Sequence, residues 1–212
     1  MKLFLTSSGI LFEQKDIFLS EFSKSPKDIK FYFIPTAADV EPDGQSWVTL
    51  SIEEFAEMGI NPIWYSLKYK TKEQISTELA DADCVWVNGG NTFYLLDIAH
   101  KTGFYDVISD LVRNKGVVYG GTSAGSILAG KSIESAGWKP EGDSNDVGIT
   151  DLTGLNFAQF IPFVHYKKLE HEVSIKQIKN SSDTVYAISD DSFIKIIDDK
   201  IELIGDIEIY ES

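Results

Sequence analysis

The chain has 212 residues, of which 43% are hydrophobic and 25% charged, and this is the composition of a soluble globular protein with one sizeable core. Its formal net charge is −14, from 19 Lys and Arg residues against 33 Asp and Glu residues. Such an acidic surface repels phosphate groups, so the charge argues against nucleic acids and anionic membranes as partners.

The sequence also lacks the patterns of membrane insertion or export. No apolar run approaches the roughly 20 residues that a membrane span needs. The apolar segment 2–6 is too short for a signal peptide and predicts a first strand instead. The single cysteine, Cys84, excludes an internal disulfide and fits a reducing compartment. We therefore expect one cytoplasmic domain over residues 1–212.

Strand and helix patterns alternate along the first part of the chain. The apolar pattern predicts strands over 2–6, 29–34, 62–67 and 116–119, and another that starts at 83 and runs into a double glycine at 89–90. Helical spacing covers 16–24, 45–58, 71–80, 93–100 and 104–114. Near-continuous apolar strands that alternate with helices imply an α/β fold, with a parallel sheet covered on both faces. Ligands of such sheets bind at the carboxyl ends of the strands.

The rest of the chain is less regular. Residues 138–153 are polar and contain glycine, which predicts a long loop. An apolar strand over 160–164 leads to His165, and a helix is expected over 169–180. Strands are expected over 184–188, 192–197 and 200–210, the last two joined by a tight turn.

The segment Gly121-Thr122-Ser123-Ala124-Gly125 fits the G-x-S-x-G pattern, in which a serine stands on a sharp turn between a strand and a helix. Glycines two residues before and after Ser123 remove Cβ atoms that would clash in such a turn. The helix that follows directs free N–H groups toward whatever bonds to the serine hydroxyl. The same pattern also occurs where a strand–helix joint merely needs glycines. Whether Ser123 is catalytic therefore depends on the other candidate residues.

A serine nucleophile needs a base, most often histidine, and the chain has three. His100 ends a helix and His171 lies in a charged helical stretch, so both are expected at the surface. His165 follows an apolar strand, where a strand end enters a crevice, and we prefer it over a merely structural role. The third member should be a carboxylate. The loop offers Glu141, Asp143, Asp146 and Asp151, and spacing does not choose among them.

The loop at Gly89 and Gly90 has two compatible interpretations. It can be a tight turn in which Asn91 or Thr92 caps the next helix, and it can also supply an oxyanion hole through the N–H of Gly90 together with that of Ala124. No G-x-G-x-x-G follows the first strand, and no group of His and Cys residues has the spacing of a metal site. We therefore expect no cofactor and no metal.

Together, the segment 87–93, the glycine-flanked serine, Asn145-Asp146 and His165 resemble the peptidase E family of serine peptidases, which includes aspartyl dipeptidase and cyanophycinase. The resemblance implies a flavodoxin-like three-layer α/β/α sandwich, similar to class I glutamine amidotransferases with serine in place of cysteine. It implies Ser123 as nucleophile, His165 as base and then acid, and Gly90 and Ala124 as oxyanion donors. Asn145-Asp146 matches the Asn-Asp of aspartyl dipeptidase, which favours Asp146 as the acid, with Glu141 and Asp143 as alternatives.

The predicted function is hydrolysis of short peptides through an acyl-enzyme, with dipeptides that begin with Asp as one substrate class. The only arginine, Arg113, is expected at the opposite end of the sheet, which leaves Lys167 and Lys168 to bind a substrate carboxylate. Two alternatives are a catalytically silent α/β/α scaffold and an esterase or amidase that acts on another acyl substrate. The sequence is also compatible with a homodimer.

Overall fold

The parallel strands predicted from the sequence lie side by side in a central sheet. The computed structural model describes residues 1–138, 142–167 and 172–212. Among them, seven strands form this sheet in the order β3-β2-β4-β5-β1-β8-β9. The strands are β3 (Ile63–Trp64), β2 (Phe31–Ile34), β4 (Cys84–Val87), β5 (Val118–Thr122), β1 (Lys2–Thr6), β8 (Phe193–Ile197) and β9 (Lys200–Ile204). The first five are parallel, whereas β8 runs antiparallel to β1 and β9 antiparallel to β8.

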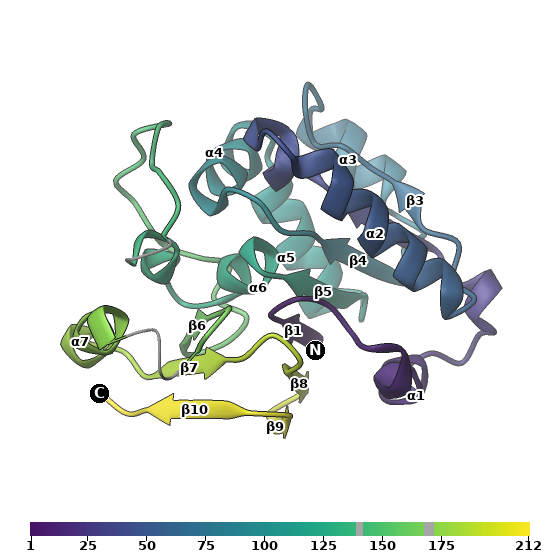
Figure 1. The fold of residues 1–212 in the computed structure, drawn as a ribbon. Helices are drawn as coiled ribbons and strands as arrows, with labels where there is room; N and C mark the ends of the chain where they lie inside the picture. The colour runs from purple at the N-terminus through teal and green to yellow at the C-terminus, as the bar shows by residue number, and fades with distance from the viewer. Residues whose placement is uncertain (139–141, 168–171) are drawn as a thin grey trace.

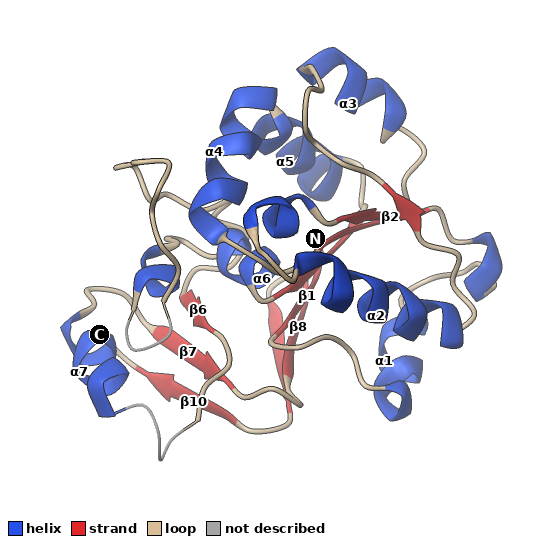
Figure 2. Ribbon diagram, turned by 45° about the horizontal axis from the view of Figure 1, so that its top comes forward, coloured by secondary structure: helices blue, strands red, loops and turns tan. Residues whose placement is uncertain are grey.

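Helices cover both faces of the sheet, which makes the three-layer α/β/α sandwich expected from the sequence (Figures 1 and 2). Alternate side chains of each strand serve the two layers, since successive residues of a strand point to opposite faces. Leu3 and Leu5 pack in one core cluster, with residues of the helices α3, α4, α5 and α6, whereas Phe4 packs in the other, with residues of α1 and α2. The helices are α1 (Lys15–Leu19), α2 (Gly44–Glu57), α3 (Lys72–Glu78), α4 (Thr92–Thr102), α5 (Phe104–Asn114) and α6 (Ala124–Ala129).

A second sheet lies at one end of the molecule and has the strand order β10-β7-β6 within the described residues (Figure 1). Its strands are β6 (Ile161–Phe163), β7 (Val185–Ile188) and β10 (Ile207–Tyr210), and the helix α7 (Glu172–Asn180) packs against it through Ile178. The strand expected over 200–210 is in fact two, because the chain turns at Gly205 with φ +91°. The consecutive strands β9 and β10 therefore belong to different sheets.

Several element bounds differ from the sequence prediction. The helix expected over 16–24 is only the short α1, and the strand expected over 62–67 pairs only at Ile63–Trp64. A short 3₁₀ helix at Glu134–Gly137, not expected from the sequence, precedes the long loop. No helix in the described parts of the chain is long and apolar enough to cross a membrane.

Close packing against the sheet sets a limit on residue size in β5. A Cβ atom at Gly120 would lie 1.9 Å from the ring of Trp86, which is fully buried. We expect Gly120→Ala to lower the free energy of unfolding by about 1–3 kcal/mol, because the ring must shift within a filled core. Urea unfolding measures the change. At Gly137 an added Cβ meets only the edge of Phe93 at 3.3 Å, so Gly137→Ala should be better tolerated. Equal stability of Gly120→Ala and the parent would contradict this packing.

Candidate active site

Three neighbouring parallel strands end at the same edge of the central sheet. Gly121 of β5 is level with Val87 of β4 and with Leu5 of β1. The residues that follow these strands therefore emerge together, namely Asn88-Gly89-Gly90 after β4, Ser123 after β5 and Ser7-Ser8 after β1. This edge is the expected place for a ligand in an α/β sheet.

Ser123 lies on the turn between β5 and α6, as the sequence pattern indicates. Its φ of +51° and ψ of −111° are strained for a residue with a side chain. The strain is held by the neighbouring strand end, because the N–H of Ser123 donates to the carbonyl oxygens of Thr6 and Ser7 at 3.1 and 3.0 Å. The turn leaves the hydroxyl of Ser123 at the sheet edge, at the N-terminus of α6.

The glycines around Ser123 are required sterically, as expected from the sequence. A Cβ at Gly121 would lie 2.5 Å from the backbone of Gly125, and a Cβ at Gly125 would lie 2.0 Å from the carbonyl oxygen of Val87. Gly90 has φ +132°, and a Cβ there would lie 2.3 Å from the backbone of Ala37. These contacts let the β4 loop, the turn at Ser123 and α6 approach one another closely.

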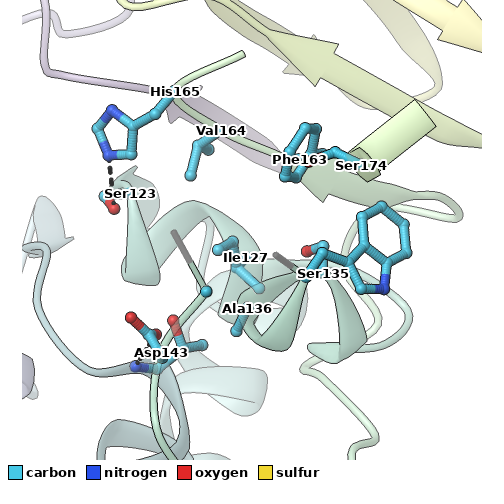
Figure 3. Close-up of a pocket in the computed structure, with 12 residues that line it drawn as sticks. Ser123, Ile127, Ser135, Ala136, Asp143, Phe163, Val164, His165 and Ser174 are labelled. Carbon is cyan, nitrogen blue, oxygen red and sulfur yellow. Dashed lines mark hydrogen bonds between the residues drawn. The ribbon is translucent and has the colours of Figure 1, made fainter. Parts of the chain in front are cut away.

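His165 follows β6 and reaches the same edge from the second sheet. Its backbone is also in the left-handed region, with φ +56°. The N–H of His165 donates to the hydroxyl of Ser7 at 2.8 Å, and the N–H of Tyr166 donates to the carbonyl of Ile188 at 3.0 Å. The imidazole then points at Ser123, with Nε2 at 3.0 Å from the serine Oγ (Figure 3).

The carboxylate at His165 belongs to Asp190. Its Oδ1 lies 2.6 Å from Nδ1 of His165. The same oxygen accepts hydrogen bonds from the hydroxyls of Ser8 at 2.8 Å and Ser7 at 3.1 Å. Ser7 therefore contacts both His165 and Asp190. Its hydroxyl accepts the backbone N–H of His165 and donates to Oδ1 of Asp190.

Asp190 arrives at this edge because β8 runs antiparallel to β1. The first residue of β8, Phe193, pairs with the last residue of β1, Thr6. The turn that precedes β8 therefore lies beside Ser7 and Ser8. Partial burial raises the pKa of Asp190, but the hydrogen bonds and charge of its neighbours outweigh that effect, so the pKa is held below its ordinary value of 3.8. The carboxylate is thus ionised at neutral pH.

The prediction of Asp146 as the carboxylate at His165 needs correction. Asp146 is exposed, in a turn of the long loop that Asn145 closes through hydrogen bonds with the backbone of Ile149. Asp143 accepts the N–H of Thr92 instead, at 2.8 Å, and Asp151 accepts that of Thr153 at 3.0 Å. Glu141 lies outside the described residues. The bonds of Asn145 and Asp151 are local side chain–backbone bonds, which are common for Asp and Asn in loops, whereas the bond of Asp143 joins the loop to the start of α4.

Asp190 was not predicted from the sequence, because the acid was expected between Ser123 and His165 in the chain. The available signal was the tract Ser189-Asp190-Asp191 between two predicted strands. Two strands in antiparallel order would place such a turn at a sheet edge, but the strand pairing was not readable from the sequence.

The other candidate residues from the sequence lie in different parts of the structure. Gly90 lines a cavity with Ser123, and Ala124 is the first residue of α6, whose N–H has no partner within the helix. Asn91 caps α4, since its side chain accepts the N–H of Tyr94. His100 is exposed and stacks on Tyr105, and Arg113 donates to the carbonyls of Leu155 and Asn156. Lys167 is exposed, whereas Lys168 and His171 lie outside the described residues.

Two cavities meet at Ser123 and His165. We call the larger, of about 390 Å³, the open cleft, and the smaller, of about 100 Å³, the inner pocket (Figure 3 shows the latter). Both include Asp143. The described residues of the open cleft are, in addition, Ser7, Ser8, Glu41, Trp47, Ser51, Asn88, Gly89, Gly90 and Thr122. Those of the inner pocket are Thr92, Ile127, Ser135, Ala136, Trp138, Gly142, Phe163, Val164 and Ser174.

A serine on a strained strand–helix turn, a histidine at its hydroxyl and a carboxylate at the other ring nitrogen form an arrangement typical of α/β hydrolytic enzymes. Comparison with known protein families shows to which group of such enzymes the chain belongs. The model of Peptidase family S51 matches residues 3–204, and the chain belongs to that family. The protein is therefore a peptidase by family.

Individual relatives agree with this assignment. An uncharacterised peptidase of Pasteurella multocida is 30% identical over 78% of this chain and 77% of its own length. A peptidase E of Nostoc is 29% identical over 85% and 74% of the two chains, respectively. A Drosophila melanogaster protein named as a probable alpha-aspartyl dipeptidase is 37% identical, over only 44% of this chain and 35% of its own. A crystal structure from Listeria monocytogenes, provisionally named peptidase E, superposes with a TM-score of 0.79 at 25% identity, over 95% of this chain and 96% of the other.

Proposed function

We propose that this protein is a serine peptidase that hydrolyses short peptides through an acyl-enzyme. The observation that carries the proposal is the continuous chain of hydrogen-bond distances from Ser123 through His165 to Asp190. Membership of a peptidase family supports peptide bonds as the target.

Each member of the chain has a role that follows from its contacts. Ser123 attacks the substrate carbonyl, and Nε2 of His165 takes the proton from its hydroxyl. Asp190 accepts the hydrogen on Nδ1, which fixes the imidazole tautomer and stabilises the imidazolium that forms. His165 then protonates the leaving amine. A water molecule, deprotonated by His165, attacks the acyl-enzyme and releases the acid product and the free serine.

The developing oxyanion needs donors beside Ser123. The N–H of Ala124, at the start of α6, and the N–H of Gly90, in the open cleft, are our candidates. The helix terminus adds its positive end to the same region. No step of this sequence needs a cofactor.

A labelling experiment tests the proposal directly. A fluorophosphonate probe should modify the protein at Ser123, as located by peptide mass spectrometry, because only an activated serine attacks phosphorus readily. His165→Ala should label far more slowly than the parent at pH 7. A panel of Leu-Leu, Ala-Leu, Glu-Leu and Asp-Leu then tests for peptide hydrolysis.

The outcomes separate the alternatives. Labelling together with hydrolysis of any dipeptide supports the proposal. Labelling without hydrolysis of any peptide would favour an esterase or amidase. Absence of both would favour a silent scaffold.

A further inference from the structure

Asp143 occupies a particular place between the two cavities at Ser123. Its side chain lines both the open cleft and the inner pocket. Its Oδ2 accepts the N–H of Thr92 at 2.8 Å, and its own N–H donates to the carbonyl of Ala136 at 2.7 Å. The start of α4 and the 3₁₀ helix at 134–137 therefore fix Asp143 in the wall of the cavities that Ser123 also lines.

Two carboxylates stand among the described lining residues of the two cavities. They belong to Asp143 and Glu41, and no Lys or Arg is among these described residues. The pKa of Glu41 is raised, mainly by burial and also by the charge of Asp143, so the two carboxyl groups are close enough to interact. Such a site favours a positively charged substrate group and disfavours a carboxylate. Every peptide with a free N-terminus carries such a positive group.

Two buried polar side chains around the site have no hydrogen-bond partner among the residues that the structure describes. Thr92 and Asn88 are each 1% exposed, and the atoms concerned are the Oγ1 of Thr92 and both amide atoms of Asn88. Thr92 lines the inner pocket and Asn88 the open cleft. Buried polar atoms in native proteins are nearly always paired, so these atoms mark polar positions behind the walls of the two cavities. The Thr92 hydroxyl stands on the residue whose N–H holds Asp143.

The inner pocket is otherwise suited to an uncharged side chain. Ile127, Ala136, Phe163 and Val164 form most of its apolar wall, with the ring of Trp138. Ser135 is occupied by a hydrogen bond to the carbonyl of Pro162. A volume of about 100 Å³ suits an aliphatic side chain of moderate size. Figure 3 shows Val164 beside His165, with Ile127, Ala136 and Phe163 farther from the imidazole.

We propose that the enzyme acts on peptides with a free N-terminal amino group on a neutral, apolar residue. Asp143 binds the α-ammonium group, and the inner pocket holds the first side chain while Ser123 attacks that residue's carbonyl. This inference depends on the serine peptidase function proposed above. It predicts that an N-terminal aspartate lowers the rate, because its carboxylate would enter the pocket that Asp143 lines.

The test compares three substrates that differ only at the first residue. Leu-Leu carries the amino group, 4-methylpentanoyl-leucine is the same molecule without it, and Asp-Leu carries an acidic side chain. Leucine release measured by chromatography gives kcat/KM for each. For the parent enzyme we expect Leu-Leu to exceed both others by roughly 10- to 100-fold, the range for a hydrogen-bonded charge pair.

Substitution of Asp143 tests which residue provides this preference. Asp143→Asn keeps an oxygen for the N–H of Thr92 and removes the charge, so the ratio of Leu-Leu to 4-methylpentanoyl-leucine should fall toward one. Asp146→Asn is the matched control, because it removes the same charge from an exposed position of the same loop. Its ratio should equal that of the parent.

Other results would contradict the proposed substrate preference. Equal rates for Leu-Leu and 4-methylpentanoyl-leucine, faster cleavage of Asp-Leu, or an unchanged ratio in Asp143→Asn would each overturn the inference. Labelling of Ser123 without cleavage of any peptide, or failure of the labelling itself, would instead refute the underlying serine peptidase function.

Discussion

Replacement of Ser123 by alanine should lower kcat for peptide hydrolysis by roughly 10⁶-fold, because the acyl-enzyme can no longer form. His165 and Asp190 stay in place in this variant, but the base contributes little to catalysis when the nucleophile is absent. Residual hydrolysis reflects substrate binding and the oxyanion donors alone. Single-turnover kinetics with Leu-Leu measures the loss.

The fold should survive this change. Ser123 holds its turn through its backbone N–H, which alanine retains, and its Oγ contacts only the imidazole among the hydrogen bonds described. Alanine, like serine, bears the strain of the positive φ at this position. Thermal unfolding should therefore give a Tm close to that of the parent. Retention of activity with an unchanged Tm would refute Ser123 as the nucleophile.

Replacement of Asp190 by asparagine should lower kcat by roughly 10²- to 10⁴-fold. An asparagine amide can donate to Nδ1 of His165, which leaves the hydrogen on Nε2, the nitrogen that faces Ser123. That tautomer cannot accept the serine proton. Because the pKa of Asp190 lies below its ordinary value of 3.8, the parent carboxylate is ionised above that value. Protonation of Asp190 therefore does not limit the rate at pH 5 to 8.

Asp146→Asn is the matched comparison for this variant. It makes the same substitution at the residue that the sequence motif favoured, and the structure places that residue in an exposed turn. We expect its kcat and KM with Leu-Leu to stay within about two-fold of the parent. If Asp146→Asn lost the activity and Asp190→Asn kept it, the loop would have to move to His165 during the reaction, and the proposed role of Asp190 would be wrong.

Much of the fold could be predicted from local patterns. Apolar runs separated by amphipathic segments predicted β1, β2, β4 and β5 with the helices between them, because hydrophobic periodicity depends on the chain's own neighbours. The glycine spacing around Ser123 was also readable, since a tight turn imposes a local steric requirement. Short β3 and the split between β9 and β10 were not readable, because pairing partners set where those strands end.

The candidate site divides in the same way. The sequence by itself determined that Ser123 stands on a strand–helix turn and that His165 follows a strand, because both depend on residues adjacent in the chain. Only the tertiary structure decided which carboxylate meets His165, since Asp190 reaches it through the antiparallel pairing of β8 with β1. It also decided that Asp143 faces both cavities. Contacts between residues distant in sequence arise from strand order, and strand order is a property of the packed sheet.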